Sequence, residues 1–410
     1  MRKRLLSMLL TLCMVLTLLP TVALAIGDPA PTTSVRVGGV TLTYTDTPVY
    51  ATTNASGAVT TGGATADNYN IKFENTTLTL RNANIKYVDT SDPAIWVSGT
   101  LTVMALGVNT VTKSVEYGNA IQANDLTLQG TGTLTATSEK EGAVYGRDNL
   151  TIKGSITLNA FSGANSSQCG YPGLSSNGTL VIEENAVVTA VGGKSYIASG
   201  GFGSAGICAT NSVTIQGNAS VTAVGGDATT GGRSVGINAG FSNTATITIG
   251  GSAEVVAVGG KSASESYGLF ASDGTGTGTI TYTGGLLVAK GGSASINKAL
   301  TNSGGDTAAP LSGADNEKFA VWGPTGIYTV LSNELSNLSN SASVGTEISD
   351  GSSSGFYWDH SNLTLTLKNV IVNAPDGASG ISLQSAAASI VLEGVNVVSA
   401  GNQTGASNSY

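Results

Sequence analysis

Cysteine, histidine and charged side chains are scarce in this sequence of 410 residues, and each shortage excludes a class of protein. Only Cys169 and Cys208 lie outside the N-terminal segment, so the chain has no disulfide framework, and the sequence does not decide whether these two pair. The single histidine, His360, leaves the long stretch before it without a histidine-based catalytic triad. Charged residues make up 11% of the chain, but 40% hydrophobic residues argue against disorder.

Basic residues are outnumbered, with 18 Lys and Arg against 26 Asp and Glu, which gives a net charge of −8. Nucleic acids and anionic lipids bind basic surfaces, so we expect no nucleic-acid partner. A polysaccharide lyase or hydrolase would need acidic groups clustered with Arg or Lys in one groove. The four arginines beyond the N-terminal segment are far apart in the sequence, at Arg36, Arg81, Arg147 and Arg233. We therefore expect that the chain is not an enzyme, and a lyase or hydrolase is the less favoured alternative.

The first 25 residues have the three parts of a secretory signal peptide. Arg2, Lys3 and Arg4 form a charged start, an apolar run extends from 5 to 19, and Ala23-Leu24-Ala25 is a small-x-small cleavage site. The apolar run is short for a bilayer span, and no later run resembles one. We expect a secreted, extracellular protein, free or associated with the cell surface, without membrane insertion after cleavage.

The chain is rich in repeated, strand-forming phrases. Residues 180–194 read LVIEENAVVTAVGGK, residues 213–227 read VTIQGNASVTAVGGD, and residues 247–261 read ITIGGSAEVVAVGGK, so the copies start 33 and 34 residues apart. Alternation of apolar and polar residues predicts strands, and Gly-Gly predicts turns. A fixed period of this length indicates a stacked array of coils.

The same pattern extends in both directions along the chain. Phrases such as LTL and LTI begin at Leu78, Leu101, Leu126, Leu150, Leu180, Val213, Ile247 and Ile280, at intervals of 23 to 34 residues. A second phrase, such as AIQA (120–123), precedes most of them, and a third, such as TLTAT (133–137), follows. Three short strands with turns need about 20–25 residues. We predict an all-β, right-handed parallel β-helix with three short strands per coil of about 23–34 residues.

Alternation also predicts which residues face inward. The expected inward residues of the second phrase are Ile95, Ile121, Val144, Ile207, Ile237 and Leu269. The expected outward threonine ladder of the first phrase is Thr79, Thr102, Thr127, Thr151, Thr214 and Thr248. Asn185, Asn218 and Ser252 recur at the kink between phrases and predict a hydrogen-bonded stack of side chains.

The predicted organisation has five parts. They are a signal peptide (1–25), a linker and N-terminal cap (26–77), a β-helix module (78–310), a connecting segment (311–357) and the start of a second, truncated module (358–410). The second module is predicted because WDHSNLTLTLKNVIV (358–372) repeats the theme of FENTTLTLRNANI (73–85).

The coil phrase also carries a resemblance. Segments such as AIQANDLTLQGTGTLTAT (120–137) and AVYGRDNLTIKGSITLNA (143–160) resemble secreted clostridial-type parallel β-helix proteins classed as carbohydrate-binding. The likeness covers most of 78–293 and again 358–400. It implies a β-helix that binds polysaccharide, in some members an acidic pectic polysaccharide with calcium, and it places no metal ligand on a particular residue.

The outward position of the second phrase is the predicted ligand-binding line. It reads Trp96, Gln122, Tyr145, Ser175, Cys208, Asn238 and Phe270 from coil to coil. Aromatic rings stack on sugar rings and amides bond to hydroxyls, so we assign sugar binding to Trp96, Gln122, Tyr145, Asn238 and Phe270. The alternative is that the rings pack under neighbouring loops.

Asp125 and Asp148 stand just before LTL and LTI, and we predict that they occupy equivalent turns one coil apart. Stacked carboxylates could hold calcium, which prefers oxygen ligands. The alternative is turn capping, and neither position has the spacing of a dedicated calcium loop. The expected function is that of a non-catalytic carbohydrate-binding or adhesive surface protein of a bacterium, with a polysaccharide partner that could be an acidic plant polysaccharide. A structural stalk without a ligand is the alternative.

Overall fold

The computed structural model describes residues 33–400 with gaps. The residues left out within that range are 90, 115–116, 164–169, 197–203, 230, 241–244, 272–277, 295, 303–317, 334, 339–341, 346–347, 349–351, 353, 376 and 384–386. The chain divides into two compact units, Met1–Pro31 and Thr32–Tyr410, and all described residues belong to the second. The expected signal peptide, Cys169 and residues 401–410 lie outside the described residues.

Every regular element in the described residues is a β-strand, from β1 (Ser34–Val37) to β37 (Val397–Ser399). The two largest sheets have 19 and 9 strands, and most of their pairs are parallel and join strands one coil apart. The predicted all-β class with parallel strands is therefore confirmed.

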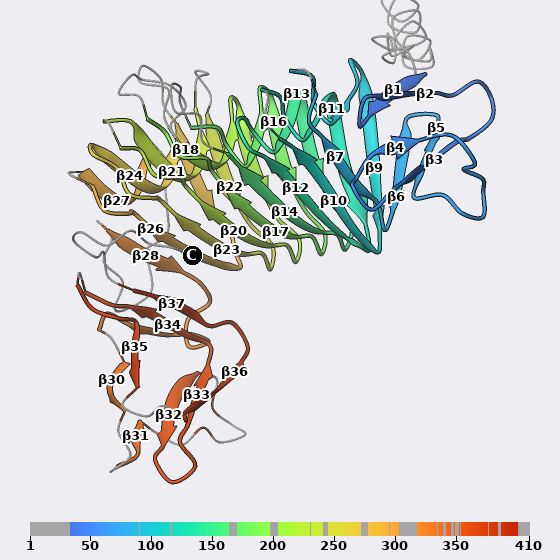
Figure 1. Ribbon diagram of the computed structural model, residues 1–410. Helices are drawn as coiled ribbons and strands as arrows, with labels where there is room; N and C mark the ends of the chain where they lie inside the picture. The colour runs from blue at the N-terminus through green and yellow to red at the C-terminus, as the bar shows by residue number, and fades with distance from the viewer. Residues whose placement is uncertain are drawn as a thin grey trace, which may run out of the picture. The chain divides into compact units, whose positions relative to one another are not determined.

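Strands of the third phrase form a column, which we call the third column, and they follow one another along the sheet in Figure 1. It consists of β7 (Asn84–Tyr87), β10 (Val108–Lys113), β12 (Thr133–Ser138), β14 (Thr157–Ser162), β17 (Val187–Val191), β20 (Ser220–Val224), β23 (Glu254–Val258) and β26 (Leu286–Lys290). Leu158 and Ala160 of β14 are fully buried, while Asn159 between them is half-buried. The period-two pattern thus puts one side of each strand into the core.

The second phrase forms another column, which we call the first column, and the LTL-type first phrase forms the second column. The first column consists of β8 (Ile95–Trp96), the starts of β11 (Ile121–Gly130) and β13 (Val144–Ile152), β15 (Leu174–Ser176), β18 (Ser204–Ala209), β21 (Arg233–Ala239), β24 (Glu265–Ala271) and β27 (Ile296–Asn302). The second column consists of β6 (Thr77–Arg81), β9 (Thr100–Leu106), the ends of β11 and β13, β16 (Thr179–Ile182), β19 (Ser212–Ile215), β22 (Thr246–Ile249) and β25 (Thr279–Tyr282).

The inward residues predicted for the first column are confirmed. Ile121 pairs with Ile95 on one side and with Val144 on the other. Ile237 pairs in the same way with Ile207 on one side and with Leu269 on the other. All six predicted residues have 0% exposure. One continuous line of aliphatic side chains therefore runs through the core.

The outward threonine ladder is confirmed in part. Thr127 pairs with Thr102 and with Thr151, and Thr214 pairs with Thr248. The placement of Thr79 is wrong, because Thr77 is the residue that pairs with Thr102, while Thr79 pairs with Met104 and is 7% exposed. Thr and Leu alternate in residues 77–80, so a shift of two residues gives the same pattern. The sequence pattern alone therefore does not fix the strand register.

Two further predictions concern the turns between strands. Asn218 Nδ2 donates to Asn185 Oδ1 at 3.1 Å, which confirms the side-chain stack for these two residues. The Gly-Gly pairs were predicted to form turns, but they have no regular secondary structure, and pairs from successive repeats lie very close together. A Cβ on Gly260 would lie 2.4 Å from the carbonyl oxygen of Gly225, so no side chain fits at that position.

Strand direction reverses where the first and second columns begin and where the third column ends. β1 runs antiparallel to β2 (Val40–Thr43) and to β8, and β5 (Ile71–Glu74) runs antiparallel to β3 (Val49–Thr53) and to β6. At the far edge of the third column, β28 (Phe319–Trp322) is antiparallel to β26.

Residues 355–399 repeat the strand order of residues 71–113. β32 (Gly355–Asp359) and β33 (Thr364–Lys368) form an antiparallel pair as β5 and β6 do, and β33 then pairs in parallel with β36 (Ser389–Glu393) as β6 does with β9. The turn hydrogen bonds recur as well. Val108 N donates to Asn82 Oδ1 and Val395 N donates to Asn369 Oδ1, each at 3.0 Å. The sequence repeat is therefore also a structural repeat.

Candidate functional site

The outward residues of the first column form a single line, which we call the outer ladder. It consists of Trp96, Gln122, Tyr145, Ser175, Cys208, Asn238 and Phe270, each paired with the next. The predicted alignment of these residues is confirmed. Paired strands lie about 4.8 Å apart, so Trp96 and Tyr145, two strands apart, are separated by about 10 Å.

The ladder is accessible over its first four residues. Trp96, Gln122, Tyr145 and Ser175 are all half-buried, which leaves part of each side chain open to solvent. Gln122 is held in place by Asn119, whose Nδ2 donates to Gln122 Oε1 at 2.8 Å. The amide oxygen is thus engaged, and Gln122 Nε2 is left as a donor between the two aromatic side chains.

The ladder is covered over its last three residues. Cys208 and Asn238 are each 2% exposed and Phe270 is 7% exposed. The expected exposure of Asn238 and Phe270 is therefore wrong, and neither side chain can stack on or bond to a polysaccharide in this conformation. Phe270 belongs to a buried cluster with Ala205, Cys208, Val235 and Tyr267, and Asn238 donates a hydrogen bond to Cys208 of that cluster.

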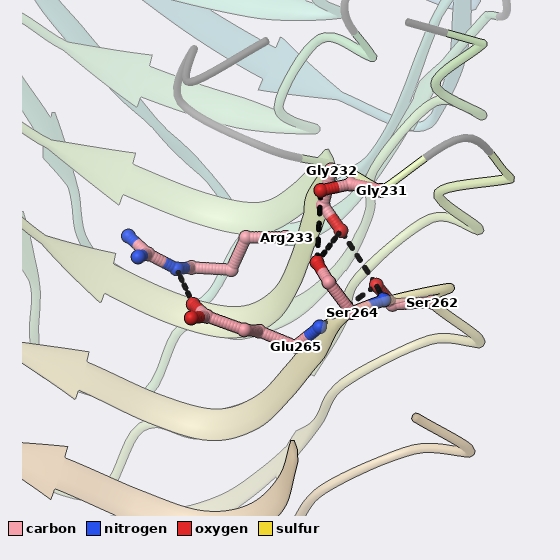
Figure 2. A network of polar contacts seen from close by, with 6 residues as sticks. All are labelled: Gly231, Gly232, Arg233, Ser262, Ser264 and Glu265. Carbon is pink, nitrogen blue, oxygen red and sulfur yellow. Dashed lines mark hydrogen bonds and ion pairs between the residues drawn. The ribbon is translucent and has the colours of Figure 1, made fainter. Parts of the chain in front are cut away.

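Arg233 and Tyr267 both contact the ring of Phe270. The guanidinium carbon of Arg233 lies 4.0 Å from the centroid of the Phe270 ring, and the Tyr267 ring packs on Phe270 at a centroid distance of 5.1 Å. Arg233 Nε also donates to Glu265 Oε2 at 2.8 Å (Figure 2). These contacts give the ring an apolar neighbour and a cation–π partner, so its face is not free for a sugar.

Serine hydroxyls also form hydrogen bonds between segments 262–264 and 231–232, which precede Glu265 and Arg233 in the sequence. Ser262 Oγ donates to Gly232 O at 2.5 Å and Ser264 Oγ donates to Gly231 O at 2.8 Å (Figure 2). This network was not predicted from the sequence. Arg233 and Glu265 are 32 residues apart, which is one coil, so the coil period contained the signal for their contact.

Cys208 lies in the covered part as a free thiol. Burial raises its pKa to about 12, although a hydrogen bond from Asn238 acts in the opposite direction. The thiol is therefore neutral at physiological pH, and a neutral thiol is neither a nucleophile nor a good metal ligand.

Arg36 borders the accessible end of the ladder, and this position was not predicted from the sequence. It pairs with Trp96 across the antiparallel contact of β1 and β8. Its Nη1 forms an ion pair with Asp92 Oδ2, and its Nη2 donates to Tyr87 Oη at 3.1 Å. The charge of Arg36 is thus compensated. No repeat pattern extends into β1, so the sequence held no signal for this contact.

Asp125 and Asp148 do not stack on each other, and their predicted equivalence is wrong. β13 has one extra residue at this point, so Asp125 pairs with Asn149. Asn149 Nδ2 donates to Asp125 Oδ1 at 2.8 Å, and Asn149 Oδ1 accepts from Thr179 Oγ1 at 2.8 Å. The neighbour of the Asp125 carboxylate is therefore an amide. Across the described parts of the chain, no three His, Cys, Asp or Glu side chains are grouped closely enough to hold a metal ion.

Comparison with family models, curated proteins and solved structures finds no match to this chain. The resemblance to clostridial-type carbohydrate-binding proteins therefore depends on the coil phrase alone. Among the described residues, no helix has the length and hydropathy needed to span a membrane.

Proposed function

We propose that this chain is a secreted, non-catalytic carbohydrate-binding or adhesive surface protein built on a right-handed parallel β-helix. Three columns of parallel strands, each one coil from the next, support the β-helix. The continuous buried line through Ile121 and Ile237 supports it as well, since stacked coils enclose their inward residues.

The accessible part of the outer ladder carries the functional proposal. Trp96 and Tyr145 offer two aromatic side chains on a sheet, and Gln122 offers an oriented amide donor between them. Aromatic faces pack on the apolar faces of sugar rings, and amides bond to sugar hydroxyls. Because backbone pairing fixes the spacing of these side chains, little conformational entropy would be lost on binding.

A titration of the full chain against a broad panel of plant and mucosal glycans tests this function. We expect saturable binding, weakened at least tenfold by Trp96→Ala and by Tyr145→Ala, a loss of about 1.4 kcal/mol or more. Thr214→Ala, on the outward side of the second column, is the matched control and should bind like the unchanged chain.

Two other outcomes lead to different functions. Absence of binding across the panel refutes carbohydrate binding and leaves a structural stalk. Release of reducing or unsaturated ends from any glycan identifies a hydrolase or a lyase.

A further inference from the structure

We propose that Trp96, Gln122 and Tyr145 bind a neutral, extended glycan that lies along the stacking direction, with one sugar per coil and no requirement for calcium. This inference rests on the proposed function and adds the charge, length and orientation of the ligand.

The spacing of the ladder sets the orientation. Trp96, Gln122 and Tyr145 stand on three consecutive strands about 4.8 Å apart. An extended, equatorially linked glycan advances by a similar distance with each sugar. One sugar therefore fits over the Trp96 ring, the next faces the Gln122 amide, and the third fits over the Tyr145 ring. A glycan lying across the ladder would meet only one of these rings.

The ladder also limits the length of the ligand. On the far side of Tyr145, Ser175 Oγ donates to Val144 O at 3.4 Å, and the next residue, Cys208, is 2% exposed. On the near side of Trp96 stands Arg36, which is engaged with Asp92. The binding site thus spans three coils, and affinity should stop increasing beyond three sugars.

The charges around the ladder favour a neutral ligand. Trp96, Gln122 and Tyr145 carry no charge, and Arg36 is already paired with Asp92. Asp125 stands three residues after Gln122, while Arg147 and the adjacent Asp148, just after Tyr145, add no net charge. With a net charge of −8 on the whole chain, an acidic polymer would meet repulsion without a free cation in the ladder to offset it.

The same surroundings argue against a calcium bridge. A bridging ion needs several oxygen ligands from the protein. Asp125 is the carboxylate nearest in sequence to Gln122, and it accepts a hydrogen bond from Asn149 Nδ2 and stacks on no second carboxylate.

Calorimetric titration with four series of oligosaccharides tests the inference. The probes are cello-, xylo- and manno-oligosaccharides of one to six sugars, and oligogalacturonates of the same lengths, each with calcium and with EDTA. We expect a neutral series to bind, with affinity that rises up to three sugars and by less than twofold beyond. EDTA and added salt should each change that affinity by less than twofold.

Variants locate the ligand on the ladder. Trp96→Leu keeps apolar packing but removes the aromatic face, and it should weaken trisaccharide binding at least tenfold. Asn119→Ala frees the positioned amide of Gln122 and should weaken trisaccharide binding several-fold while leaving that of the monosaccharide unchanged. Circular dichroism checks that each variant is folded, and Thr214→Ala is the control.

The outcomes separate this inference from the proposed function. Binding of oligogalacturonates alone, or binding that EDTA abolishes, overturns the neutral ligand and leaves carbohydrate binding intact. Neutral binding that Trp96→Leu and Tyr145→Ala leave unchanged places the site elsewhere and overturns the inference. No binding of these series or of the wider panel refutes the proposed function itself.

Discussion

Substituting Gly107 by alanine should destabilise the turn between β9 and β10 in two separable ways. Gly107 has φ of +67°, a conformation that side chains with a Cβ rarely adopt. An added Cβ would also lie 2.1 Å from Asn82 Oδ1, the oxygen that accepts a hydrogen bond from Val108 N at 3.0 Å. Alanine therefore strains the backbone and displaces Asn82 from its partner.

The two effects have different sizes. A left-handed conformation costs about 1–2 kcal/mol for a residue other than glycine. Loss of the hydrogen bond costs about 1 kcal/mol more, so Gly107→Ala should lower the free energy of unfolding by about 2–3 kcal/mol. Gly63→Ala is the matched control, because Gly63 has φ of +74° and no atom within 4 Å of its added Cβ. It should cost the backbone strain alone.

Equilibrium urea unfolding, followed by circular dichroism and tryptophan fluorescence, measures these costs. In the double variant with Asn82→Ala, Gly107→Ala should cost about 1 kcal/mol less than it does alone, because the hydrogen bond is already absent. Equal costs for Gly107→Ala and Gly63→Ala, or strict additivity with Asn82→Ala, would refute this reasoning. Gly394→Ala should reproduce the effect in the repeat, since its added Cβ would lie 2.1 Å from Asn369 Oδ1.

Three other perturbations test the core and its buried groups. Ile237→Ala should lower the free energy of unfolding by about 2–5 kcal/mol in urea, whereas outward Thr214→Ala should change it by at most about 0.5 kcal/mol; similar costs would contradict the inward assignment of Ile237. Cys208 should resist a thiol reagent in the folded protein, because a rise of its pKa from 9.0 to about 12 lowers the thiolate fraction about a thousand-fold at neutral pH. The unchanged chain and Cys208→Ser should thus show equal numbers of reactive thiols when folded and differ by one after unfolding, and a difference in the folded state would refute the burial. Burial raises the pKa of Glu141 above 4.5, while a backbone hydrogen bond from Gly118 and the charge of Lys113 oppose this. The Glu141 carboxyl group therefore binds its proton more tightly in the folded chain than in the unfolded chain. The stability that this protonation contributes is lost as pH rises through the raised pKa. The Tm of Glu141→Gln should increase relative to that of the unchanged chain as pH rises from about 4 through the raised pKa, and a constant difference would contradict this.

Much of the strand arrangement could be predicted from the sequence, because equivalent positions of successive repeats pair with each other in the parallel sheets. Ile207, Ile237 and Leu269 occupy one position of a phrase that recurs once per coil, so their pairing followed from the period. The same logic aligned Trp96 with Gln122 and Tyr145. Alternation then distinguished the inward from the outward side.

The remaining features depend on local departures from the repeat. One extra residue in β13 shifts the register, so that Asp125 pairs with Asn149 and not with Asp148. The spacing of the repeats does not predict such a bulge. Phe270 has the alternation of an exposed residue, but Arg233 from the preceding coil lies on its ring. Arg36 reaches Trp96 through a strand that is antiparallel, and strand direction is not encoded in an alternating pattern.

The antiparallel strands at the start of the first and second columns also have a consequence for how several copies behave in solution. β8 is bonded by β1 on one edge and β11 on the other, and β6 by β5 and β9, so neither offers a vacant row of amides and carbonyls there. Strands of like molecules that recruit one another edge to edge build fibrils, and that process needs a vacant row. At the start of the first and second columns, the antiparallel strands therefore protect the sheet edge from edge-to-edge pairing with another molecule.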